Sequence, residues 1–191
     1  MARPVTDQGG PGQNDPLTRP TVLRGGQVIL EPVTAAHVGD LRRILETPQV
    51  RMRWGDEAAS EHWPFDDPSA IRFAIMRDGV VRGMVQYGEE DEPHYRHASI
   101  DIYVDPQVHG AGIGRDAVRT LARHLILDRG HHRLVIDPAA DNVAAIRCYA
   151  SVGFRPVGVM RSYERDVDGP GWHDGLLMDL LATDLVLDEV L

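Results

Sequence analysis

The sequence has only one cysteine, Cys148, among its 191 residues. A single thiol excludes an internal disulfide and favours a reducing compartment. No stretch offers the roughly eighteen uninterrupted apolar residues that a membrane-spanning helix needs. The first residues also lack the positively charged start and apolar run of an export signal. We therefore expect a cytoplasmic protein with no membrane partner.

The chain also has fewer basic than acidic residues. The chain carries 20 Lys and Arg against 29 Asp and Glu, a formal net charge of −9. This balance argues against a nucleic-acid partner and favours cationic substrates if the acids gather near a site, although acidity also serves solubility alone. The pair His131-His132 has no His-Glu-x-x-His pattern or further cysteine around it, so we expect no metal.

The composition predicts one domain with an N-terminal extension. Residues 1–20 contain four prolines, three glycines and almost no large apolar side chains. Such a segment cannot repay its ordering entropy, so we predict a disordered tail over 1–20 and a single folded domain over 21–191. The whole chain is 42% hydrophobic and 26% charged, which is ordinary for a globular protein.

Apolar periodicity predicts a mixed α/β protein. Alternating patterns predict strands over 27–33, 71–76, 80–87, 97–104, 133–137, 154–164 and 176–181. Helices are predicted after Thr34 as N-cap with an end at Pro48, from Gly112, and from Asp141 or Asn142 to Gly153. Residues 52–57 are expected to form a loop and the acidic run 89–92 a turn.

The stretch 100–116 is the most informative part of the chain. An alternating strand stops at Pro106, and a turn follows that contains Gly110, Gly112 and Gly114. The first free N–H groups of the next helix then lie in a turn without side chains, which predicts a cradle for phosphate or pyrophosphate. Arg115 stands where a dinucleotide fingerprint requires glycine, and the chain has no Gly-Lys-Ser/Thr of a P-loop. A tight turn without a ligand is the alternative.

Two motifs in order resemble the GNAT acetyltransferase superfamily. The segment 109–114, His-Gly-Ala-Gly-Ile-Gly, is similar to its Gln/Arg-x-x-Gly-x-Gly/Ala pyrophosphate loop, with His109 in place of Gln or Arg. The segment 142–154 is similar to its Asn-x-x-Ala-x-x-x-Tyr-x-x-x-Gly-Phe pattern. The resemblance spans about 22–181. It implies a GNAT fold, with a twisted, mostly antiparallel sheet of about six to seven strands, about four flanking helices, and acetyl-coenzyme A between splayed central strands.

The resemblance also implies which residues bind the coenzyme and carry the chemistry. The implied coenzyme contacts are Tyr103, Val104, His109, Gly110, Ala111, Gly112, Ile113, Gly114, Arg115, Asn142 and Tyr149. Acetyl transfer to an amine needs a base for the amine and an acid for the leaving thiolate. Asp101 is the candidate base, or else a carboxylate paired on the sheet surface. Tyr149 is the candidate acid, or else a core tyrosine of an amphipathic helix.

Within the superfamily, the segments 53–57, 136–138 and 145–149 are most similar to aminoglycoside 6'-N-acetyltransferases. This resemblance implies that Trp54, Asp56, Asp101 and Asp137 contact a small cationic amine. The alternative role of Trp54 is to anchor a helical connection, and that of Asp137 is to cap the turn at Pro138. Other functions left open are acetylation of a protein N-terminus or another small amine, and acetyl-coenzyme A binding without turnover. Monomer and homodimer remain equally open.

Overall fold

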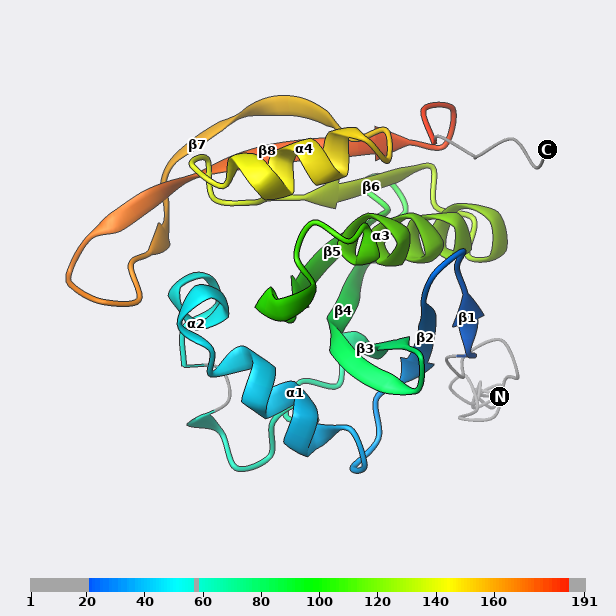
Figure 1. Cartoon of the computed structure of the whole chain (residues 1–191). Helices are drawn as coiled ribbons and strands as arrows, with labels where there is room; N and C mark the ends of the chain where they lie inside the picture. Colours follow the sequence, from blue (N-terminus) through cyan, green and yellow to red (C-terminus); the bar gives the residue numbers. More distant parts are fainter. Residues whose placement is uncertain (1–20, 57–58, 186–191) are drawn as a thin grey trace, which may run out of the picture.

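The computed structural model describes residues 21–56 and 59–185, and its strands form one eight-stranded sheet in the order β1-β2-β3-β4-β5-β6-β8-β7 (Figure 1). The strands are β1 (Leu23–Arg24), β2 (Ile29–Pro32), β3 (Ile71–Arg77), β4 (Val80–Glu90), β5 (His97–Val104), β6 (Arg133–Ile136), β7 (Arg155–Arg165) and β8 (Trp172–Leu181). The α-helices are α1 (Val38–Leu45), α2 (Pro48–Trp54), α3 (Ile113–Arg123) and α4 (Val143–Ala150), with a 3-10 turn at Pro106–Val108 and a π-helical turn at His124–Asp128. The predicted tail, 1–20, lies outside the described residues.

The sheet opens between its two central strands. β5 and β6 form the one parallel pair among the described strands, and they pair only at Ala98 with Leu134 and at Ser99 with Val135. β5 then continues to Val104, whereas β6 ends at Ile136. Backbone groups of β5 beyond Ser99 therefore lack a neighbouring strand on this side, and a gap is left at the middle of the sheet.

Two hydrophobic clusters cover the two faces of the sheet. The larger cluster packs α3 residues such as Leu121 against Ile100 and Phe154. The smaller cluster packs α1 residues such as Leu41 against Met84 and Tyr103 of β4 and β5. Because successive side chains of a strand face opposite sides, Ile100 and Tyr103 reach different clusters. β5 is thereby held from both faces, which fixes the strand that borders the gap.

The first third of the chain differs most from the predicted elements. An eighth strand, β1, pairs Leu23 with Leu30 and is too short to show an alternating pattern. Thr34 does not cap a helix, because α1 begins at Val38 with His37 as its N-cap. The N–H of Thr34 donates to Nδ1 of His37 in the turn before the helix. Pro48 does not simply end the helix. It occupies the first turn of α2, where its missing N–H costs nothing.

Two other predicted boundaries also shift. Residues 52–54, expected in a loop, continue α2 to Trp54. Glu89 and Glu90, expected in a turn, extend β4 and pair with Ala98 and His97. The extension is tolerated because Glu89 is paired with Arg129 and His131 rather than exposed as part of a charge run.

Candidate active site

The glycine turn forms as the sequence predicts. α3 begins at Ile113 with Gly112 as its N-cap. Gly110 and Gly112 have φ angles of 78° and 80°, in the left-handed region that side chains other than glycine rarely adopt. The Nε2–H of His109 donates to the carbonyl of Val104 (3.0 Å), which ties the turn to the end of β5.

A buried carboxylate fixes the other side of this turn. Asp116, in the first turn of α3, accepts the backbone N–H groups of Gly26, Gln27 and Val28 at 3.2, 2.6 and 3.0 Å. Burial raises its pKa, but these N–H groups and Arg119 outweigh burial and hold the pKa below its usual value. The start of α3 is therefore fastened to the β1–β2 turn before any ligand binds.

A groove of about 500 Å³ lies along the turn, and we name it the glycine-loop groove. It runs between the end of β5, the N-terminus of α3 and one side of α4. Unpaired N–H groups at the start of a helix and the helix dipole favour an anionic group there. Ten predicted coenzyme contacts line it: Tyr103, Val104, His109, Gly110, Gly112, Ile113, Gly114, Arg115, Asn142 and Tyr149.

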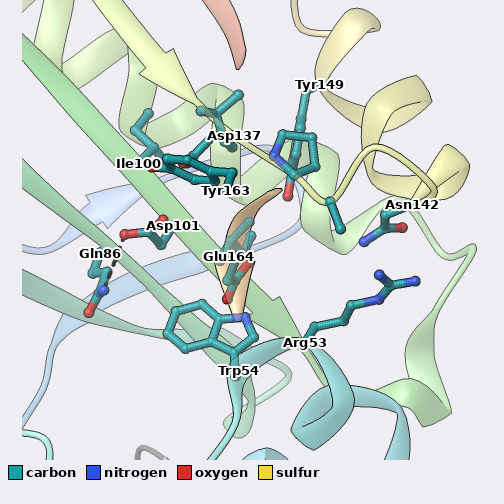
Figure 2. A pocket seen from close by; sticks show the side chains of 14 residues that line it. Arg53, Trp54, Gln86, Ile100, Asp101, Asp137, Asn142, Tyr149, Tyr163 and Glu164 are labelled. Carbon is teal, nitrogen blue, oxygen red and sulfur yellow. Dashed lines mark hydrogen bonds between the residues drawn. The ribbon is translucent and has the colours of Figure 1, made fainter. Parts of the chain in front are cut away.

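A second cavity, of about 530 Å³, opens on the other side of the gap, and we name it the acidic cavity (Figure 2). Three carboxylates line it: Asp101 from β5, Asp137 from the turn after β6, and Glu164 from β7. Trp54 and Tyr163 supply aromatic walls. β6 ends at Ile136, which leaves the cavity open beside β5, and β7 lies beyond β6 and β8 at the edge of the sheet, so its side chains reach the cavity across β8.

Asp101 is the carboxylate at the edge of the gap. It lies directly opposite Gln86 of β4, whose Nε2 donates to its Oδ2 (3.3 Å). Burial raises its pKa, the Gln86 hydrogen bond lowers it, and the charges of Asp137 and Glu164 raise it further, with a net increase. A carboxylate with a raised pKa in a cavity is a better proton acceptor than an exposed one.

Tyr149 stands where the two cavities meet. It is 8% exposed and lines both the glycine-loop groove and the acidic cavity. Asn142 caps α4 by accepting the N–H of Ala145 (3.2 Å), and this cap sets the helix that carries Tyr149. Burial, with help from nearby negative groups, raises the pKa of the phenol, so Tyr149 remains a proton donor at neutral pH.

Two predicted site residues do not reach either cavity. Asp56 is exposed and pairs with Arg51 at 2.8 Å on the outer side of α2. It lies at the end of a helix that the sequence pattern did not predict, so its side chain is turned away. Ala111 belongs to the glycine turn but does not line the groove. Tyr103 lines the groove, although its hydroxyl is used by the carbonyl of Leu41 (3.3 Å).

Four polar side chains of the acidic cavity were missed by sequence reasoning: Arg53, Gln86, Tyr163 and Glu164. Gln86 could have been found, because a hairpin partner directly opposite Asp101 is expected to touch it. Tyr163 and Glu164 could not, since an irregularity in β7 between Met160 and Glu164 decides where they point. Arg53, which pairs with Asp141 at 2.7 Å, spans both cavities.

Within 21–56 and 59–185, no three His, Cys, Asp or Glu side chains gather closely enough to hold a metal ion. None of the helices in these ranges has the length and apolar character needed to cross a bilayer.

The chain is similar in sequence to known acetyltransferases. A mycothiol acetyltransferase of Rhodococcus erythropolis is 32% identical over 117 residues, 58% of this chain and 38% of that protein. The N-alpha-acetyltransferase RimI of Mycobacterium tuberculosis is 39% identical over 74 residues, 38% of this chain and 44% of that protein. The chain therefore matches less than half the length of these relatives.

The fold comparison covers more of the chain. RimJ of Mycobacterium smegmatis, solved in complex with CoA-disulfide, superposes with a TM-score of 0.71 at 24% identity, covering 87% of this chain and 88% of that one. The predicted GNAT fold is confirmed, with eight strands instead of six to seven. The model of the family described as "Acetyltransferase (GNAT) family" matches residues 40–154. The chain belongs to the GNAT acetyltransferase family.

Proposed function

We propose that this protein transfers the acetyl group of acetyl-coenzyme A to a primary amine of a small molecule that carries more than one positive charge. The 6'-amine of an aminoglycoside is the specific acceptor that we favour. The observation that carries the proposal is the meeting of an anion-binding groove and a three-carboxylate cavity at Tyr149.

The residues of the glycine-loop groove fit the coenzyme. Its pyrophosphate would lie at the N-terminus of α3, on the amides around Gly112 and Gly114. A Cβ at Gly114 would lie 3.5 Å from Val104 and 3.9 Å from Cys148, in ordinary contact with two residues of the groove lining, so the glycine leaves that space free. Acetyl-coenzyme A supplies the thioester that the amine attacks.

The amide of Val104 is the proposed donor to the thioester carbonyl. The N–H of Asp105 donates to Arg82 of β4 (2.7 Å), and successive N–H groups of a strand point to opposite edges. The N–H of Val104 therefore points toward the gap, where β6 no longer pairs with β5. A fixed backbone donor at this position stabilises the oxyanion that forms on attack.

Asp101 and Tyr149, whose pKa values are both raised, are the proposed proton acceptor and proton donor. Asp101, directly or through water, takes a proton from the amine as the C–N bond forms, and Tyr149 gives its proton to the sulfur as the C–S bond breaks. The products are the amide and coenzyme A, and exchange with water restores both side chains. Burial keeps Tyr149 protonated, and by raising the pKa of Asp101 it makes the ionised carboxylate a stronger base.

The charge of the acidic cavity supports a polycationic acceptor. Asp101, Asp137 and Glu164 outnumber the single cation, Arg53, which is already paired with Asp141. Glu164 contacts Nε2 of His173 (3.2 Å), but Asp101 and Asp137 have no cationic side chain beside them in the cavity lining, and a single ammonium group would neutralise only one of them. Several amines on one molecule would neutralise them.

A protein N-terminus is the second candidate acceptor. The similarity to the N-alpha-acetyltransferase RimI favours it, since 39% identity over 74 residues is the highest identity among the relatives described above. A peptide N-terminus has one ammonium group, so its recognition would depend less on the carboxylates of the acidic cavity. Salt dependence therefore separates the two candidates.

The test is thiol release from acetyl-coenzyme A with kanamycin, spermine and N-terminal peptides as parallel acceptors. We expect kanamycin turnover, with a KM that rises with salt. Asp137→Asn should raise this KM about fivefold, more at low than at high ionic strength, and leave acetyl-coenzyme A affinity unchanged. Asp168→Asn, a change on the β7–β8 turn outside the cavity, is the matched control. Turnover of peptides alone, or a kanamycin KM that ignores both salt and Asp137, would end the aminoglycoside assignment.

A further inference from the structure

One wall of the acidic cavity comes from a part of the chain outside the family match. The match ends at Phe154, and β7 begins at Arg155. Nearly all of β7 is exposed. Even so, two of its residues, Tyr163 and Glu164, line the acidic cavity. The acceptor side of the site is thus completed by a hairpin that the family pattern does not include.

An irregularity in β7 turns these residues toward the cavity. The pairing of β7 with β8 shifts between Met160 and Glu164. Ser162, inside this shift, has a φ angle of 47°, and its N–H donates to the Oδ1 of Asp174 on β8 (2.8 Å). A serine in the left-handed region is uncommon, and a bulge of this kind re-aims the side chains that follow it.

Gly175 then makes room for the ring of Tyr163. β8 lies between β7 and β6, so a side chain that reaches from β7 toward Asp137 must cross β8. A Cβ at Gly175 would lie 2.9 Å from Cδ1 of Tyr163 and 3.1 Å from Cε of Met160. Gly175 is not among the glycines with positive φ, so the site uses its missing side chain and not its backbone freedom.

The ring of Tyr163 lies beside Asp137 and is partly exposed to solvent (Figure 2). The neighbouring carboxylate of Asp137, then burial and further negative charge, raise the pKa of Tyr163 to about 12, so the phenol stays protonated beside that carboxylate. Tyr163 is nevertheless 49% exposed. Figure 2 shows it next to Asp137, with Glu164 between it and Trp54. An open aromatic face among carboxylates suits the body of a cationic amine.

We propose that Tyr163, brought over Gly175 by the bulge in β7, is a specificity-determining residue for the acceptor. Its phenol orients the carboxylate of Asp137, and its ring packs against the acceptor beside an ammonium group. The inference rests on the proposed transfer to a cationic amine. It assigns acceptor choice to the β7–β8 hairpin, separately from the coenzyme groove.

The test uses thiol release with kanamycin or spermine, whichever the wild-type protein acetylates. Tyr163→Ala should raise the acceptor KM about tenfold and Tyr163→Phe about threefold, with acetyl-coenzyme A KM unchanged and kcat within about twofold. Gly175→Ala should act like Tyr163→Ala, because it displaces the ring. In the Tyr163→Ala background, Gly175→Ala should add nothing. Val159→Ala, an exposed change on the same strand, is the control.

Three kinetic outcomes would overturn the inference. The first is an unchanged acceptor KM in both Tyr163 variants. The second is an equal effect of Gly175→Ala with and without the tyrosine ring, which would mean that the glycine acts on the strand alone. Parallel losses of kcat and Tm in all variants would likewise indicate a structural role and contradict the proposal.

A second measurement keeps this inference separate from the proposed function. If the wild-type protein acetylates no amine, the proposed function fails, but the contact of Tyr163 is still measurable by NMR with tyrosine labelled at Cζ. The resonance that Tyr163→Phe removes should shift in Asp137→Asn and Gly175→Ala, shift on addition of kanamycin, and stay in place in Val159→Ala. A resonance that responds neither to Asp137→Asn nor to kanamycin would refute the inference.

Discussion

The glycine-loop groove and the acidic cavity share Tyr149 but are built in opposite ways. The groove depends on backbone groups of one continuous turn and the start of α3, all inside the matched region 40–154. The acidic cavity depends on side chains from α2, β4, β5, the turn after β6, and β7. The groove therefore depends on short-range backbone geometry, whereas the acidic cavity depends on long-range packing of side chains.

The largest expected effect is at the point where the two cavities meet. Tyr149→Phe keeps the ring but removes the proton donor, so turnover should fall about 10²-fold or more. Acetyl-coenzyme A affinity, measured by calorimetry, should hardly change. Tyr95→Phe, at a tyrosine 74% exposed in the β4–β5 loop, is the control. Normal turnover in Tyr149→Phe would remove this residue from the mechanism.

The next largest effect is expected at Asp101. Asp101→Asn should lower kcat/KM about tenfold or more, since the amide cannot accept the amine proton. In the wild-type protein, activity should fall as pH drops through the pKa of Asp101, at a higher pH than for an ordinary aspartate. Thiol release measured across pH checks both expectations. A pH profile that is unchanged in Asp101→Asn would exclude Asp101 as the base.

Replacing Asp101 should also raise the thermal stability of the folded protein. Burial raises the pKa of Asp101 in the folded protein, so the protonated form stabilises the fold below the unfolded pKa, and this contribution is lost as pH rises through the folded pKa. At pH 7 the ionised Asp101 is destabilising, and Asp101→Asn should raise Tm. The difference should shrink near about pH 3. Calorimetry at both pH values tests the sign.

A smaller effect is expected in the groove. Gly112→Val should weaken acetyl-coenzyme A binding about tenfold, because the left-handed turn is strained and a Cβ would lie 3.1 Å from Gln27. Gly130→Val is the matched control, since Gly130 also has a positive φ (71°) but lies away from the groove. Both variants should lose stability, and only Gly112→Val should lose affinity. Equal affinities in the two folded variants would contradict the cradle.

The smallest effect is expected at the one position that departs from the family motif. His109→Ala removes the hydrogen bond to Val104 but leaves the backbone amides of the turn in place. Acetyl-coenzyme A affinity should therefore change less than about threefold. His109→Gln, which restores the family residue, should be neutral. A loss of tenfold or more would mean that the side chain, and not the backbone, holds the ligand.

Local patterns in the sequence predicted the elements that border the groove. A helix was predicted from Gly112, and α3 begins at Ile113; Asp141 or Asn142 was predicted as the next N-cap, and Asn142 caps α4. Both features depend on residues within one or two turns of each other, where side-chain periodicity and glycine conformation act directly. The same reasoning failed at Asp56, because an unpredicted helix turned that residue outward to Arg51.

The sequence by itself determined the glycine turn, the two helices that border the groove and the alternation of β5, because each follows from short-range geometry. Only the tertiary structure decided that Asp101, Asp137 and Glu164 share one cavity and that Tyr163 crosses β8 at Gly175. Those neighbours come from strands far apart in the chain. Their meeting depends on the order of strands in the sheet, on the early end of the β5–β6 pairing and on one shift of register in β7, and no local pattern encodes these.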